Sequence, residues 1–133
     1  MDHKKMTIEE MCFESEKQLF DRKSARISAT ALVSTIIAFA NADGGKIAIG
    51  IEDDGMISGI DNHMNNINDI LRAPLDYCYP SIMIDTEILP CIDHNGKNNH
   101  ILVINVPQSS NLHTNHRDEV FLRVGDKSKK TYI

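Results

Sequence analysis

Residues 38–55 read AFANADGGKIAIGIEDDG and contain, in order, a helix end, a glycine reversal, a buried strand and an acidic turn. The residues from 28 to 41 are apolar on almost every side, which is typical of a helix packed over most of its surface. Asn41 and the pair Gly44-Gly45 tolerate the left-handed backbone that a helix end and a tight turn require. Residues 46–51 form an apolar run of strand length. This stretch therefore predicts a buried helix that leads directly into a buried strand.

Patterns on either side of this stretch predict the remaining elements. A second helix is expected over 62–77, where apolar residues recur at helical spacing and Pro74 bends or ends the helix. Thr7 and Glu10 begin a short helix as a capping box. Alternation and turn signals predict a hairpin turn at 93–97 and strands over 18–23, 56–60, 82–89, 100–106 and 120–124. Together these elements predict an α/β (α+β) fold in which a single mixed β-sheet packs with two main helices.

The composition fits one domain, because 41% of the 133 residues are apolar and no linker or low-complexity tract divides the chain. We expect a lead-in over 1–13 and one domain over 14–133. The sequence has neither an apolar run long enough to span a bilayer nor the apolar core of a signal peptide. Its three cysteines are widely spaced, without the paired spacing of zinc ligands, as in a reducing compartment. These features predict a cytoplasmic protein with no membrane partner.

The net charge of −5 argues against indiscriminate nucleic-acid binding, which usually requires a strongly basic domain. The charge is uneven, however. Residues 43–93 hold ten acidic and two basic residues, whereas 17–26 hold four basic and one acidic, and 117–130 hold five basic and three acidic. These basic segments flank the first and last predicted strands, so they would form one binding groove if those strands lie close together.

The candidate nucleic-acid-binding residues are six of the nine basic residues of these two segments, namely Arg22, Lys23, Arg26, Arg123, Lys127 and Lys129. Aromatic residues that could stack on single-stranded bases are scarce, since the chain has no Trp. Duplex DNA or structured RNA is therefore the expected partner.

The pattern AFAN-x-x-GG-K-I-x-I-G-I-x-D-D-G-x-I-x-G-I over residues 38–60 resembles the Schlafen-type AlbA-like domain. The likeness extends upstream to residues 14–16 and 21–26, and downstream through 59–63, 71–74 and 119–126. The resemblance implies the same fold and, for bacterial members, a DNA-binding domain of transcriptional regulators or of divergent AAA-family proteins. Longer relatives commonly continue into further domains, so it stays open whether this chain is a fragment.

The resemblance also implies a set of candidate catalytic and metal-binding residues, Glu16, Asp21 and Asp53. In ribonuclease members of the Schlafen family, two acids five positions apart precede the buried helix, and a third lies in the acidic turn. Lys23 stands where a lysine commonly follows, and Asp21 replaces the more usual glutamate. Clustered carboxylates bind Mg²⁺ or Mn²⁺, which would stabilise a phosphodiester during hydrolysis. Alternatively, Asp53 is simply a residue that suits a tight turn.

Three functions therefore remain open. The first is a nucleic-acid-binding module of the transcription-regulator type, and the second is a metal-dependent endonuclease acting on RNA or DNA. The third is an interaction module in which exposed sheet edges pair two copies into a homodimer. Gly44-Gly45 does not indicate a phosphate site, because it follows a helix C-terminus instead of preceding an N-terminus. His113 and His116 lie in a polar loop that we expect to face the bound partner.

Overall fold

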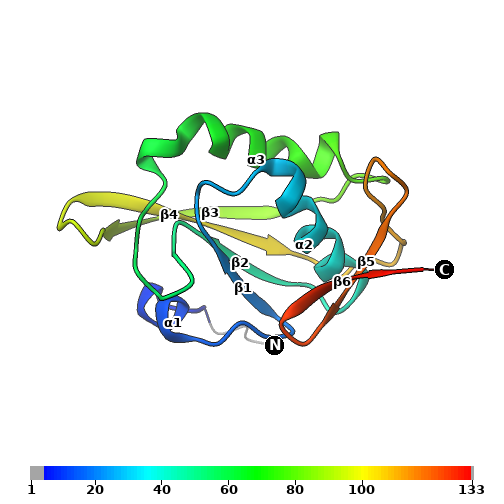
Figure 1. Cartoon of the computed structure of the whole chain (residues 1–133), viewed down its shortest axis with the longest axis horizontal. Helices are drawn as coiled ribbons and strands as arrows, with labels where there is room; N and C mark the ends of the chain where they lie inside the picture. The colour runs from blue at the N-terminus through cyan, green and yellow to red at the C-terminus, as the bar shows by residue number, and fades with distance from the viewer. Residues whose placement is uncertain (1–4, 133) are drawn as a thin grey trace.

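The computed structural model describes residues 5–132 and contains a four-stranded sheet, a two-stranded hairpin and two long helices (Figure 1). The elements in chain order are α1 (Ile8–Phe13), β1 (Phe20–Lys23), α2 (Ala29–Asn41), β2 (Gly45–Ile49), the 3₁₀-helix η1 (Asp61–His63), α3 (Met64–Asp76), β3 (Asp85–Ile92), β4 (Asn98–Val106), β5 (Val120–Val124) and β6 (Lys127–Thr131). The predicted mixed sheet with two main helices is confirmed. Within residues 5–132, none of the helices combines the length and the apolarity that crossing a lipid bilayer requires.

Helix α2 forms the centre of the larger core, and eight of its thirteen residues are buried. Ser28 begins the helix by accepting the N–H of Ala31 on its hydroxyl at 3.2 Å. At the other end, the N–H of Gly44 bonds to the carbonyl of Phe39 at 2.8 Å. Gly45 packs so closely on Phe39 that a Cβ there would lie 2.6 Å from the ring. The glycine pair therefore lets the chain turn from α2 directly into β2.

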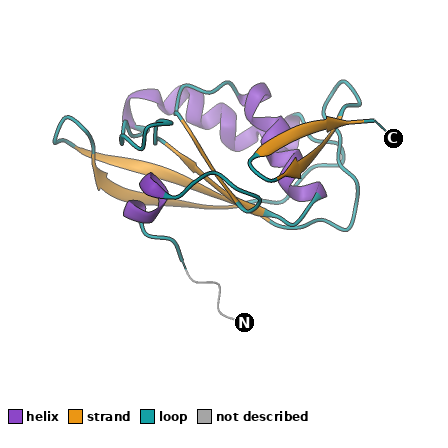
Figure 2. Cartoon of the chain, turned by 60° about the horizontal axis from the view of Figure 1, so that its bottom comes forward, coloured by secondary structure: helices purple, strands orange, loops and turns teal. Residues whose placement is uncertain are grey.

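The four-stranded sheet has the order β1-β2-β4-β3, with β1 and β2 parallel and the other neighbours antiparallel. Helix α2 supplies the crossover that a parallel pair needs. Helices α2 and α3 cover one face of the sheet, and α1 lies against the other face (Figure 2). Strand β2 is buried on both faces, with Ile47 and Ile49 in the helical core and Ala48 in the core beneath α1. This double burial explains why its apolar run is unbroken.

Strands β5 and β6 form a separate hairpin that packs against α2. Strand β5 was predicted, but β6 was not, because its sequence KSKKT has no apolar alternation. Pairing with β5 makes it a strand, with Leu122 opposite Lys129 and Arg123 opposite Ser128. The strand conformation of β6 is thus imposed by its partner.

Two further expectations differ from the structure. Residues 56–60 contribute only the isolated bridge between Ile57 and Ile51, because the N–H groups of Ser58 and Gly59 both bond to the Gly50 carbonyl and bend the chain. The predicted strand there is therefore wrong. The second helix, expected over 62–77 with a bend or an end at Pro74, is present as α3, but it does not end at Pro74, which lies inside its last turn.

Candidate functional site

A buried salt bridge joins β1 to the β5–β6 hairpin, so the first and last predicted strands do lie close together. Arg123 Nη1 lies 2.9 Å from Asp21 Oδ2, and the two side chains are only 1% and 3% exposed. The guanidinium also donates to the carbonyl of Lys17 from Nε (3.1 Å) and Nη2 (3.0 Å), and to that of Phe20 at 3.1 Å. It stacks on the Phe39 ring, with its carbon 4.6 Å from the ring centre. Arg123 therefore holds the hairpin against the sheet.

Glu16 lies beside Asp21 and covers the outer edge of β1. Its Oε2 accepts the N–H of Arg22 at 3.1 Å, so this outward-facing backbone donor of β1 bonds to a side chain. Burial, followed by a hydrogen bond with the Asp21 carboxyl, raises the pKa of Glu16. Lys23 Nζ lies 3.5 Å from the other oxygen of Asp21. The structure thus brings together Glu16, Asp21 and Lys23, three of the residues that the Schlafen resemblance singled out.

Asp53 does not join this group. It is exposed in the turn after β2, where the neighbouring Asp54 accepts the N–H of Met56 at 2.9 Å. Within residues 5–132, no three His, Cys, Asp or Glu side chains lie close enough together to hold a metal ion. The Asp21 carboxylate is also bound by a guanidinium, which competes for the lone pairs that a metal would use. Within the described residues, the three predicted metal ligands Glu16, Asp21 and Asp53 therefore do not come together.

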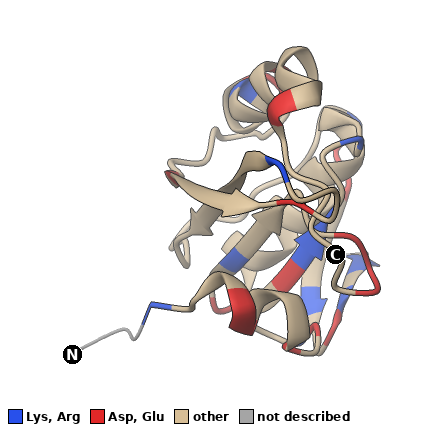
Figure 3. Ribbon diagram, turned by 90° about the vertical axis from the view of Figure 1, so that its left-hand side faces the viewer, with Lys and Arg blue, Asp and Glu red and all other residues tan. Residues whose placement is uncertain are grey.

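The predicted nucleic-acid-binding residues of the first basic segment are buried or paired. Arg22 is 7% exposed, and its Nε donates to a backbone carbonyl of α1 at 3.0 Å. Lys23 pairs with Asp21, and Arg26 pairs with Glu52 at 2.7 Å. Figure 3 shows basic and acidic residues next to one another on the same elements. The expected contacts of Arg22 and Arg123 with nucleic acid are therefore not available, because both guanidinium groups bond to backbone carbonyls in the interior.

The remaining predicted residues lie on the outer face of the β5–β6 hairpin. Residues paired across a hairpin project from the same side, and this face includes Leu122, Val124, Lys127 and Lys129. Both lysines are exposed, and neither forms an ion pair with any residue of the described chain. Lys130 alternates to the other side, where it pairs with Glu119 at 2.7 Å. The hairpin thus presents two lysines without an ion-pair partner to solvent, next to the exposed Asp126 of its turn.

Asn41 has a role that sequence reasoning missed. Its Nδ2 donates to the carbonyls of His113 (3.0 Å) and Phe121 (3.1 Å), and its Oδ1 accepts the N–H of His113 at 2.9 Å. The His113 ring is buried, with its nitrogens 2.7 Å from the Pro80 carbonyl and 2.7 Å from Ser109 Oγ. The loop before β5 is therefore anchored to α2, and His113 does not face a partner as expected. The signal was ambiguous because Asn is also a common helix-ending residue.

This arrangement matches a known class of domain. The family model described as Schlafen, AlbA_2 matches residues 13–132, which is nearly the whole chain. The chain therefore belongs to the Schlafen AlbA_2 family, a family associated with nucleic-acid binding.

Among solved structures, the chain is similar to the crystal structure of the DIP2311 protein from Corynebacterium diphtheriae, with a TM-score of 0.62 and 19% sequence identity. The match covers 86% of this chain and 22% of that chain. At this identity the likeness shows the fold alone, and the covered share indicates that this fold also occurs within a larger protein. A search of curated proteins found no significant match.

Proposed function

We propose that this chain is a nucleic-acid-binding domain of the transcription-regulator type, which contacts the phosphates of duplex DNA or structured RNA. The contact surface is the outer face of the β5–β6 hairpin. The proposal rests on Lys127 and Lys129, which are exposed, project from one side and have no ion-pair partner within residues 5–132. Membership of a family associated with nucleic-acid binding supports it.

Several other surface cations are less suited to this role because each is already paired with a carboxylate. Lys17 pairs with Glu14 at 3.1 Å, and Arg26 pairs with Glu52 at 2.7 Å. A paired cation must give up its partner before it can bind a phosphate, whereas an unpaired one only releases solvent counterions. Few phosphates are contacted, so we expect weak binding that depends on salt and not on sequence.

The test is fluorescence anisotropy of the 133-residue chain titrated onto a labelled DNA duplex and a labelled RNA hairpin at several salt concentrations. Each lysine that contacts a phosphate contributes about one unit to the slope of log affinity against log salt. Lys127→Ala and Lys129→Ala should each lower the slope by about one unit.

Lys97→Ala is the matched control. Lys97 is exposed in the turn between β3 and β4, without an ion pair among the described residues, and it lies at the end of the molecule remote from the β5–β6 hairpin (Figures 1 and 2). Its replacement should leave the slope unchanged. Equal effects of all three substitutions would show that binding depends only on the net charge of the protein and not on the hairpin surface. Binding that does not change with salt would contradict phosphate contacts altogether.

The same titration addresses the endonuclease alternative, whose predicted residues are Glu16, Asp21 and Asp53. Probes incubated with Mn²⁺ or with EDTA are run on a denaturing gel after the titration. Intact probes under both conditions would support a binding domain without turnover. Cutting that requires Mn²⁺ and is abolished by Glu16→Gln would support the endonuclease.

A further inference from the structure

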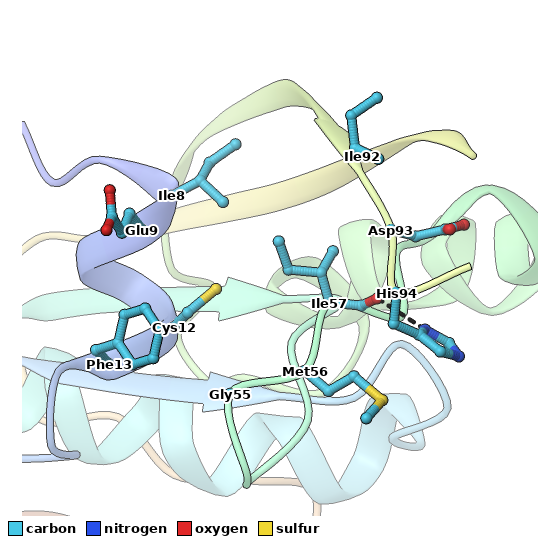
Figure 4. A pocket seen from close by; sticks show the side chains of 10 residues that line it. All are labelled: Ile8, Glu9, Cys12, Phe13, Gly55, Met56, Ile57, Ile92, Asp93 and His94. Carbon is cyan, nitrogen blue, oxygen red and sulfur yellow. Dashed lines mark hydrogen bonds between the residues drawn. The ribbon is translucent and has the colours of Figure 1, made fainter. Parts of the chain in front are cut away.

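A groove of about 400 Å³ separates α1 from the turn at 55–57 and from the end of β3 (Figure 4). Three large apolar side chains line it and are nevertheless exposed, namely Phe13 (81%), Ile92 (58%) and Met56 (46%). Exposed apolar side chains gathered around a hollow commonly mark a binding surface. The proposed nucleic-acid contact through the hairpin makes no use of this groove, which is called the acidic groove below.

The charged residues that line the acidic groove are all acidic, although Lys97 lies in the same turn as Asp93. Glu9 and Asp93 line it, Asp53 and Asp54 lie in the adjoining turn, and no Lys or Arg of the described chain is among the lining residues. Hydrogen bonds, first from the side chain of Asn99 and then from backbone N–H groups, lower the pKa of Asp93. The rim therefore carries negative charge at neutral pH.

Short-range contacts fix the walls of the groove before anything binds. The backbone N–H of His94 and its ring Nδ1 both lie 2.9 Å from the carbonyl of Ile57, which joins the turn to the β3–β4 loop (Figure 4). Gly55 approaches α1 so closely that a Cβ there would lie 2.5 Å from the Cys12 carbonyl oxygen. A preformed hollow loses little conformational entropy when it is filled.

We propose that the acidic groove binds a cationic amphipathic segment of a partner protein. Its apolar side chains enter the hollow between Phe13, Met56 and Ile92, and its Lys or Arg side chains meet the carboxylates of the rim. The volume suits a few side chains instead of the face of a folded domain. Charge complementarity selects a basic segment over an acidic or neutral one.

A second copy of this chain fits the groove less well. The basic surface that it would offer is the outer face of the β5–β6 hairpin, which lies on a different side of the molecule from α1 (Figures 1 and 2). Such a contact would join the hairpin of one copy to the groove of the next. A free groove and a free hairpin would then remain at the two ends of the assembly, so that it tends to grow into filaments. A separate basic segment fills the groove without this consequence.

The probe is a fluorescein-labelled peptide with Leu and Lys at helical spacing, titrated onto the whole chain by anisotropy. Two control peptides carry Glu in place of Lys, or Ser in place of Leu. Only the Leu/Lys peptide is expected to bind. Ile92→Asn should weaken its binding about fivefold or more, as removal of an apolar anchor from an interface does.

Ile88→Asn is the matched control, because Ile88 lies on the same strand with nearly the same exposure, 55%, but outside the groove. It should change the affinity by less than about twofold. The proposal is overturned if the Leu/Lys peptide does not bind, if the Glu peptide binds equally well, or if both substitutions act alike. Sedimentation that shows filaments dispersed by Ile92→Asn would also overturn it, in favour of a second copy as the occupant.

Discussion

Arg123→Met tests whether the buried Asp21–Arg123 pair holds the hairpin on the sheet. The substitution keeps an unbranched apolar chain that can still cover the Phe39 ring. It removes the salt bridge at 2.9 Å and the three hydrogen bonds that the guanidinium donates to the carbonyls of Lys17 and Phe20. It also leaves the Asp21 carboxylate, 3% exposed, without its main partner.

Removing one member of a buried ion pair typically costs about 3–5 kcal/mol, because the other charge stays buried. Lys23 Nζ remains 3.5 Å from Asp21 and is itself only 30% exposed, so the expected loss lies at the lower end, about 3 kcal/mol. With an m-value of about 1.5 kcal/mol/M, the urea midpoint should fall by about 2 M. Asp21→Asn combined with Arg123→Met also removes the carboxylate charge that would be left without a partner. The double variant should therefore lose less unfolding free energy than the sum of the losses in the two single variants.

The assay is urea unfolding of the whole chain followed by circular dichroism. Lys129→Met is the control, because Lys129 sits on the outer face of the same hairpin and should change the free energy of unfolding by less than about 0.5 kcal/mol. A loss below about 1 kcal/mol in Arg123→Met, at an unchanged m-value, would refute the structural role. Strict additivity in the double variant would refute the coupling between the two side chains.

Three further outcomes are expected. Gly59 (φ +77) and Gly96 (φ +76) share a left-handed backbone, but only at Gly59 would a Cβ meet Asn99, at 2.1 Å. In urea unfolding, Gly96→Ala should therefore lower the free energy of unfolding by about 1 kcal/mol. Gly59→Ala should lower it by at least about 2 kcal/mol more. Equal losses in the two variants would contradict the close approach of Gly59 to Asn99. Asn41→Ala removes three hydrogen bonds to β5 and to the loop before it, so it should lower the free energy of unfolding by about 2–3 kcal/mol. It should also make that loop a site of limited proteolysis. A loop that stays uncut would argue against its anchoring by Asn41. The raised pKa of Glu16 means that its contribution to stability is full below its ordinary value of 4.5 and is lost as pH rises through the folded value. Glu16→Gln should therefore gain stability relative to the unsubstituted chain as pH rises above 4.5. A pH-independent difference would show that the pKa is not raised.

The helix α2 and strand β2 could be predicted because each carries its own physical signal. Fourteen nearly apolar residues are too long for a strand, and a glycine pair after Asn41 marks where the helix must end. The capping box of Thr7 likewise identified α1, which the structure confirms. Strand β6 carried no such signal, since its three lysines become a strand only through pairing with β5.

The side-chain contacts of the candidate site depended on tertiary packing and could not be predicted. Arg123 has the sequence context of a surface residue in a short strand, yet it is buried because β5 packs on α2 and beside β1. The resemblance placed Glu16 and Asp21 in one group, and that placement agrees with their contact. No local pattern indicated that Asp21 would be bound by an arginine 102 residues away.

The homodimer hypothesis relied on open sheet edges, and the edge formed by β1 is not open. Arg123 Nη2 bonds to the carbonyl of Phe20 at 3.1 Å, and Glu16 accepts the N–H of Arg22. These two backbone groups are the ones that an added strand would use. Glu16 and Arg123 therefore cover backbone groups at the β1 edge of the four-stranded sheet.

The opposite edge, formed by β3, is interrupted at one position. Pro90 lies opposite His100, whose carbonyl bonds to Ile60 on the far side from β3. The pair is therefore one of the non-hydrogen-bonded pairs of the antiparallel ladder, and the N–H that Pro90 lacks is one that would have faced the open edge. A proline at this position costs β4 no bond and removes a donor from any incoming strand. Pro90 on β3 and the contacts of Glu16 and Arg123 on β1 thus each remove backbone groups that strand addition would use at these positions. The homodimer itself stays a prediction, and sedimentation of the whole chain is the measurement that tests it.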